Sequence, residues 1–215
     1  MRLYKLDKSV LSFKNNAENF LNGLTSNEMD QPKNAFLNVH GKIVATVDQI
    51  KKGDDEYLLL IEKNFEKDLL THLDRYTKLS SVKIKKLDKH VYLNLNQTPG
   101  AGFGQGFLVE DDVLGTCVSE EEYMLFRLQN NMPVQGVDYN HEFLLNVSDT
   151  KYVSFTKGCF LGQEPVSKVH NRSQPTWKLI VKFEDECSEE EKSKLTSVVM
   201  DPDSGRKMGF VFVKT

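Results

Sequence analysis

The chain has few cysteines and histidines, and their spacing does not suggest a metal site. It contains 3 cysteines and 5 histidines in 215 residues. Cys117, Cys159 and Cys187 lie far apart without a C-x-x-C pair, so the sequence predicts no zinc or iron–sulfur cluster bound by this chain alone. Free thiols are typical of a reducing compartment, and we therefore expect a cytoplasmic protein.

The chain also lacks an excess of charge and any long hydrophobic run. Its formal net charge is -3, with acidic and basic residues interspersed, which argues against a nucleic-acid surface and against a polybasic membrane anchor. No apolar run approaches the roughly 20 residues of a membrane helix, and the first residues contain no signal-peptide core. We expect a globular protein that binds neither nucleic acid nor membranes.

The first half of the chain has the patterns of a mixed α+β fold. Helical spacing of apolar residues predicts helices over residues 17–24, capped by Asn15 or Asn16, and over residues 64–76. Gly41 marks a tight turn between two strands. Alternation or a continuous apolar run predicts strands at residues 35–39, 42–50, 57–61, 82–85 and 91–95. This order fits a sheet with helices on one face.

The second half contains one clear helix signal and then a β-rich end. Ser119 opens a capping box for a helix through Asn131, before Pro133. The glycines of residues 99–106 do not match a phosphate-binding loop and no helix follows them, so this stretch is predicted to be a loop. An acidic connection is expected at residues 184–191. Strands are predicted at residues 152–155, 176–183, 195–200 and 207–213, with a turn at 201–205.

The most unusual stretch is residues 157–164, which follow the predicted strand at 152–155. Pro165 is suited to a first helical turn, so residues 162–164 look like the entry to a helix. Cys159 then lies just before a helix N-terminus with Lys157 two residues away, where charge and dipole favour a thiolate. The alternative is that Cys159 is a small buried hydrophobic residue.

This stretch carries a resemblance to a known family. The chain resembles the YgfZ-type folate-binding proteins, relatives of the glycine-cleavage T-protein, an aminomethyltransferase. The family's K-G-C-[FY]-x-G-Q-E motif is matched at every fixed position, by Lys157, Gly158, Cys159, Phe160, Gly162, Gln163 and Glu164. Supporting matches in the same order cover about residues 1–180, and comprise residues 20–25, 36–38 and 41–43, and Arg127 with Pro133, Gly136 and Asp138.

The resemblance implies a fold and a role. The fold would be a tripartite ring of two α+β regions and a C-terminal β-barrel, with residues 1–172 forming the folate-binding part and residues 173–215 an abbreviated β domain. The role would be that of a tetrahydrofolate-binding accessory protein in iron–sulfur cluster assembly or repair, with Cys159 as the functional thiol. Iron–sulfur proteins or their assembly factors would be its partners.

The same resemblance suggests roles for individual residues. A reduced folate, or another pterin-bearing ligand, would bind near Arg127 and residues 157–164. Lys157 would help hold Cys159 as a thiolate, the form that attacks or binds soft metals. The remaining motif residues would shape the loop or face the ligand. Candidates for the folate's glutamate tail are Lys42, Lys168 and Arg172, because carboxylates call for cations. The alternative for these cations, and for Arg127, is an ordinary solvated surface position.

Two other functions remain open. The acidic residues of the T-proteins correspond here to Ala45 and Thr46, and their R-x-E glutamate to Gln129, which argues against aminomethyl transfer. A different folate-dependent one-carbon transferase would need Asp48 as its acid or base. A folate-free protein-binding module is the other alternative, and the short C-terminal region favours it.

Overall fold

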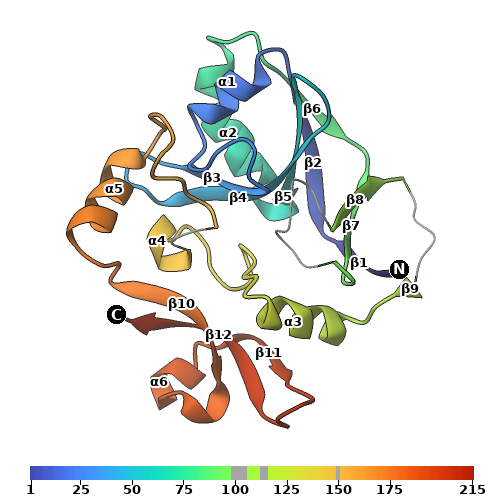
Figure 1. The fold of residues 1–215 in the computed structure, drawn as a ribbon, viewed down its shortest axis with the longest axis vertical. Helices are drawn as coiled ribbons and strands as arrows, with labels where there is room; N and C mark the ends of the chain where they lie inside the picture. The colour runs from blue at the N-terminus through green and yellow to red at the C-terminus, as the bar shows by residue number, and fades with distance from the viewer. Residues whose placement is uncertain (98–105, 112–115, 149–150) are drawn as a thin grey trace.

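The structure, a computed structural model, describes residues 1–97, 106–111, 116–148 and 151–215 (Figure 1). It is an α+β protein whose described strands form three separate sheets. The glycine-rich loop predicted at residues 99–106 lies outside the described residues apart from Gly106. In the part of the chain that the structure describes, no helix is long and apolar enough to span a membrane.

The largest sheet has five strands, and two helices cover one of its faces (Figure 1). Leu21 of helix α1 (Ala17–Asn22) and Leu69 of helix α2 (Glu66–Thr77) are fully buried in one core with Phe13 and Leu59 of the sheet. Its neighbouring strands are antiparallel and follow the order β3 (Lys33–Leu37), β4 (Ile43–Lys51), β5 (Glu56–Glu62), β2 (Lys8–Lys14) and β6 (Lys83–Leu87).

A second sheet pairs the start of the chain with its middle. Its strands follow the order β8 (Phe107–Glu110), β7 (His90–Asn94), β1 (Arg2–Leu6) and β9 (Thr116–Cys117). Helix α3 (Glu120–Gln129) follows this sheet, and the short helix α4 (Leu144–Val147) lies between α3 and helix α5 (Gln163–Arg172) in Figure 1. The neighbouring strands β1 and β2 thus belong to different sheets.

The C-terminal region is an open antiparallel sheet of three strands, and no closed barrel forms among the described residues. Its order is β10 (Trp177–Phe183), β12 (Lys207–Lys214) and β11 (Thr196–Met200), with helix α6 (Glu189–Lys192) in the acidic connection. Leu179 and Phe210 of this sheet share a core with Leu128 of α3 and Leu144 of α4. The hydrophobic core therefore continues across the domain boundary predicted at residue 172, and that boundary stays a prediction.

Most predicted elements are confirmed, but the strand predicted at residues 152–155 is wrong. This segment instead runs beside residues 23–28, to which it is held by single hydrogen bonds. The backbone N–H of Ser154 donates to the Ser26 carbonyl at 3.0 Å, and the Ser26 hydroxyl donates to the Tyr152 carbonyl at 2.5 Å. Polar groups of this segment are thus satisfied by a neighbouring loop rather than by a sheet.

Several helix boundaries also differ from the predicted ones. The helix that follows Ser119 ends at Gln129 rather than Asn131, although the Ser119 hydroxyl accepts the Glu122 N–H as predicted. The short helices α4 and α6 were not predicted, because four residues are too few to show a helical period. Asn16 precedes α1, but its side chain does not cap the helix.

The cap of α1 comes from a distant carboxylate. The two Asp55 oxygens accept the backbone N–H groups of Asn16 and Ala17 at 2.6 and 2.7 Å. We expect Asp55→Ala to lower the free energy of unfolding by about 1 kcal/mol, since two helix-terminal donors lose their acceptor. The matched control is Asp54→Ala, at an exposed neighbouring position, and urea unfolding should show no comparable loss there. Equal effects of the two substitutions would contradict the capping role.

Candidate functional site

The motif segment is fixed at the entry to α5 by one glycine. Gly162 has φ +82°, and a Cβ there would lie 2.4 Å from the Asn38 carbonyl oxygen and 2.9 Å from the Leu37 Cβ. Only glycine fits both this left-handed backbone and this close approach. On the other side of the contact, a Cβ on Gly41 would lie within 3.2 Å of Pro165 and Val166. The start of α5 is therefore seated on the turn between β3 and β4.

The side chain of Lys157 anchors one end of the segment. Its side chain is buried, and its ammonium donates to the backbone carbonyls of Thr25 and Asn27, at 2.7 Å in each case. Burial lowers the Lys157 pKa to about 8, against the opposing effect of the Glu28 carboxylate. These two bonds explain why a lysine is buried here. The predicted effect of Lys157 on the Cys159 thiol stays a prediction.

Between these anchors the motif presents its thiol to solvent. Cys159 and Gly158 are exposed, whereas Phe160 is buried under the segment, with the Lys157 ammonium 5.5 Å from its ring centre. A Cβ on Gly158 would meet nothing within 4 Å, so Gly158 is not required by the backbone as Gly162 is. Within the described part of the chain, no three His, Cys, Asp and Glu side chains gather around Cys159 or elsewhere as a metal site.

The other residues of the motif and the predicted tail-binding cations lie on or near α5. Gln163 is half-buried, and Glu164 is exposed on the first turn. Lys168 and Arg172 are exposed one turn apart on the same helix, and Lys42 is exposed beside Gly41, which packs on that helix. The structure therefore brings the motif and these three cations to one region.

Arg127 does not belong to that region. Helices α3 and α5 lie on opposite sides of α4 (Figure 1). The Arg127 guanidinium is buried against the Asp138 carboxylate, and its Nε donates to the Met132 carbonyl at 3.1 Å. It is neither a solvated surface group nor a neighbour of Cys159, so the predicted site divides into two places.

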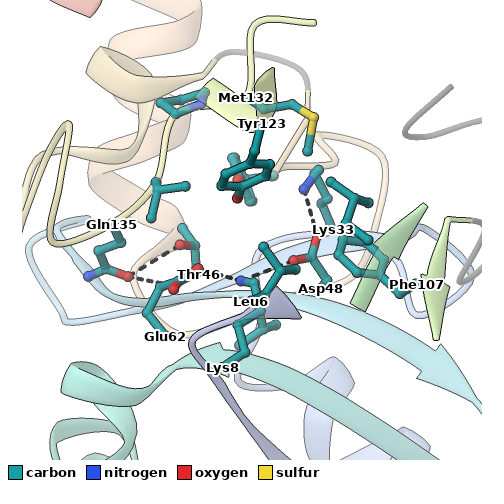
Figure 2. Close-up of a pocket in the computed structure, with 15 residues that line it drawn as sticks. Leu6, Lys8, Lys33, Thr46, Asp48, Glu62, Phe107, Tyr123, Met132 and Gln135 are labelled. Carbon is teal, nitrogen blue, oxygen red and sulfur yellow. Dashed lines mark hydrogen bonds and ion pairs between the residues drawn. The ribbon is translucent and has the colours of Figure 1, made fainter. Parts of the chain in front are cut away.

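A row of charges that the sequence did not reveal lies on the five-stranded sheet, with Asp48 buried and the other three side chains half-buried. Lys33 and Asp48 are directly opposed on β3 and β4, and so are Lys8 and Glu62 on β2 and β5. The Lys33 ammonium lies 2.5 Å from Asp48, and the Lys8 ammonium lies 2.5 Å from Glu62 and 3.2 Å from Asp48 (Figure 2). Two cations and two carboxylates thus neutralise one another across four adjacent strands.

Polar groups beside this row are paired as well. The Thr46 hydroxyl lies 2.8 Å from the Tyr139 hydroxyl, and the Gln135 side-chain oxygen accepts the Thr46 N–H at 2.8 Å. The enclosed space among these side chains is about 30 Å³. Drug-sized ligands occupy pockets of roughly 300–1,000 Å³, so this central cavity has room for water but not for a pterin ring.

The pKa values of the ionisable groups around the central cavity are shifted from their ordinary values. Burial by itself raises the Asp48 pKa, but Lys33 and Lys8 outweigh it, and the pKa is lowered. Burial likewise opposes protonation of Lys8, but Glu62 and Asp48 raise its pKa above the ordinary value. Burial raises the pKa of Tyr123, in the cavity wall, to about 12. Asp48 is therefore held ionised as an ion-pair partner.

Comparison with known proteins supports the fold alone. No family model and no curated protein matches this chain. Among solved structures it is similar to the crystal structure of glycine cleavage system aminomethyltransferase T from Bartonella henselae, with a TM-score of 0.75 and 11% sequence identity, over 99% of this chain and 78% of that chain. The chain has a T-protein-like fold. Its place among the YgfZ-type proteins stays a prediction.

The two motif glycines provide a matched test of this geometry. Gly162→Ala should lower the free energy of unfolding by about 1–3 kcal/mol for the left-handed backbone alone, with a further loss from the contact with Asn38. Gly158→Ala should change it by less than about 0.5 kcal/mol, because the position is open. Urea unfolding of the two variants measures the difference, and similar stabilities would contradict the docking of α5 on the turn.

The charge row predicts a pH-dependent stability. A carboxylate whose pKa falls on folding stabilises the protein above its unfolded pKa, and the effect is lost as the pH drops through the folded pKa. Asp48→Asn should therefore cost about 3–5 kcal/mol at pH 7, because the Lys33 ammonium loses its partner and Lys8 keeps only Glu62. The difference in the free energy of unfolding between the variant and the wild type should shrink below about pH 4. Urea unfolding at pH 7 and below about pH 4 measures this difference, with Asp54→Asn as the control. A difference that does not change with pH would contradict the role of Asp48 as an ionised partner.

Proposed function

We propose that this protein is a cytoplasmic accessory factor of iron–sulfur proteins that binds a reduced folate and acts through the Cys159 thiol. The observation that carries the proposal is the way Cys159 is presented. The thiol is exposed on a short loop whose two ends are fixed, by the buried Lys157 on one side and by Gly162 on the other. An exposed thiol on a rigid support is suited to exchange or soft-metal chemistry with a partner protein.

The T-protein-like fold supports the folate part of the proposal, because the similar solved structure is an aminomethyltransferase of the glycine cleavage system. The one-carbon transferase alternative is less well supported. Its required acid or base, Asp48, is buried, and its two oxygens pair with Lys33 and Lys8, which lower its pKa and make it a weak base. The small central cavity is the observation that favours the second candidate, a folate-free module that binds partner proteins.

Substitution of the thiol tests the proposal directly. We expect Cys159→Ala to abolish the ability of the protein to restore iron–sulfur enzyme activity in cells that lack it. The melting temperature should move by less than about 4 °C, equivalent to about 1 kcal/mol, since an exposed side chain contributes little packing. Cys117→Ala removes another exposed thiol and should restore activity fully. Full activity of Cys159→Ala would refute the thiol mechanism.

Calorimetric titration with tetrahydrofolate under reducing, anaerobic conditions tests the ligand separately. Binding in the micromolar range would support the folate-linked function. If no heat of binding is detected while Cys159→Ala still fails to restore activity, the folate-free module is the better description, and the thiol role is unaffected.

A further inference from the structure

A cleft of about 500 Å³ lies between the start of α3 and the edge strand β11 (Figure 1). Its apolar lining includes Met124 of α3 and, on β11, Val198 and Met200, which are 42% and 44% exposed. Val137, also exposed, borders an adjoining cleft together with Met124 and Val198. Large hydrophobic side chains that gather on a surface mark an interaction site, whereas single scattered ones do not. We call this surface the α3–β11 face, and define it by Glu121, Met124, Val137, Val198, Met200 and Lys207.

The apolar part of the α3–β11 face depends on a strained strand. A β-bulge interrupts β11 between Thr196 and Val199, and Ser197 within it has φ +53°. A non-glycine residue in this conformation is uncommon and is held only where the surroundings require it. Val199 is buried whereas Val198 is exposed, so the bulge presents an apolar side chain to solvent. Bulges also hinder the addition of a further strand to an edge, so a partner of this face is bound through side chains.

The Asp138 carboxylate holds the bulge in place. One of its oxygens accepts the hydroxyl groups of Thr196 and Ser197, at 2.8 and 2.6 Å. The other oxygen accepts the Val134 N–H at 2.7 Å and binds the Arg127 guanidinium. Because Asp138 and Arg127 are buried, the exposed position of Val198 is fixed from the inside of the molecule.

The two sides of the cleft carry opposite charges. Glu120 and Glu121, on the first turn of α3, belong to one side, and Lys207, at the start of β12, belongs to the other. Glu121 and Lys207 are exposed, and neither makes an ion pair with a described residue. The acidic side is therefore formed by the helix and the basic side by the sheet, and each side also contributes apolar side chains.

We propose that the α3–β11 face is the contact surface of a symmetric dimer, so that its partner is a second copy of this chain. A two-fold axis through the cleft places the acidic side of one copy against the basic side of the other. Glu121 of each copy then pairs with Lys207 of the other copy, and Val198 and Met200 form the apolar centre. Opposite charges on the two sides of one patch are what a self-complementary surface requires.

Two further properties of the chain agree with a dimer of this kind. The net charge of each chain is only -3, so the overall repulsion between two copies is small. Helix α5, which follows the Cys159 loop, lies on the other side of α4 from α3 (Figure 1). The contact therefore leaves both Cys159 thiols exposed, and it is independent of the function proposed above.

Sedimentation equilibrium of the full chain, at about 1–100 µM protein and about 0.05 M salt, tests the dimer. The mass of the wild type should rise with concentration from 24.6 kDa, the mass of one chain, towards twice this value. Glu121→Lys and Lys207→Glu should each raise the dissociation constant at least about tenfold, because each opposes like charges twice across the axis. An equimolar mixture of these two variants should return to within about threefold of the wild type, because opposite charges then meet at both pairs.

Matched variants separate the face from general effects of charge and polarity. Val198→Asp should raise the dissociation constant at least about tenfold, because it places a charge in the apolar centre. Leu79→Asp makes the same kind of change at a side chain that is 91% exposed outside the face, and should have no effect. Lys214→Glu reverses a charge at the other end of β12 and should also have none.

Each other outcome overturns the proposal. A wild type that keeps the mass of one chain at every concentration would show that the face serves a different partner. A dimer that survives Val198→Asp and both charge reversals would be joined through another surface. If each charge reversal dissociates the dimer but their mixture does not restore it, Glu121 and Lys207 do not pair across a two-fold axis. Recovery in the mixture also shows that both variants are folded.

Discussion

The buried charge row of Lys33, Asp48, Glu62 and Lys8 is the constraint on which the centre of this molecule depends. Four charges on one sheet face are tolerable because each carboxylate has an ammonium partner, and removing any one leaves the other three with an unbalanced charge. The same mutual pairing fills the space between the large sheet and α3. The space left among these side chains is only about 30 Å³.

The Asp138 carboxylate is a second constraint, since it joins the end of α3, the following turn and the C-terminal strand β11. The shared core and this carboxylate fix the edge strand against α3. The C-terminal region is thereby held to the rest of the chain, with no closed barrel among the described residues.

Local features could be predicted from the sequence, whereas long-range ones could not. Gly162 and Pro165 correctly indicate the entry to α5, because turn and helix chemistry is local. The burial of Lys157 could not be foreseen, since its acceptors lie about 130 residues earlier in the chain. The alternation in β2 and β4 predicts strands, but the register that opposes Lys8 to Glu62 and Lys33 to Asp48 comes from the tertiary pairing.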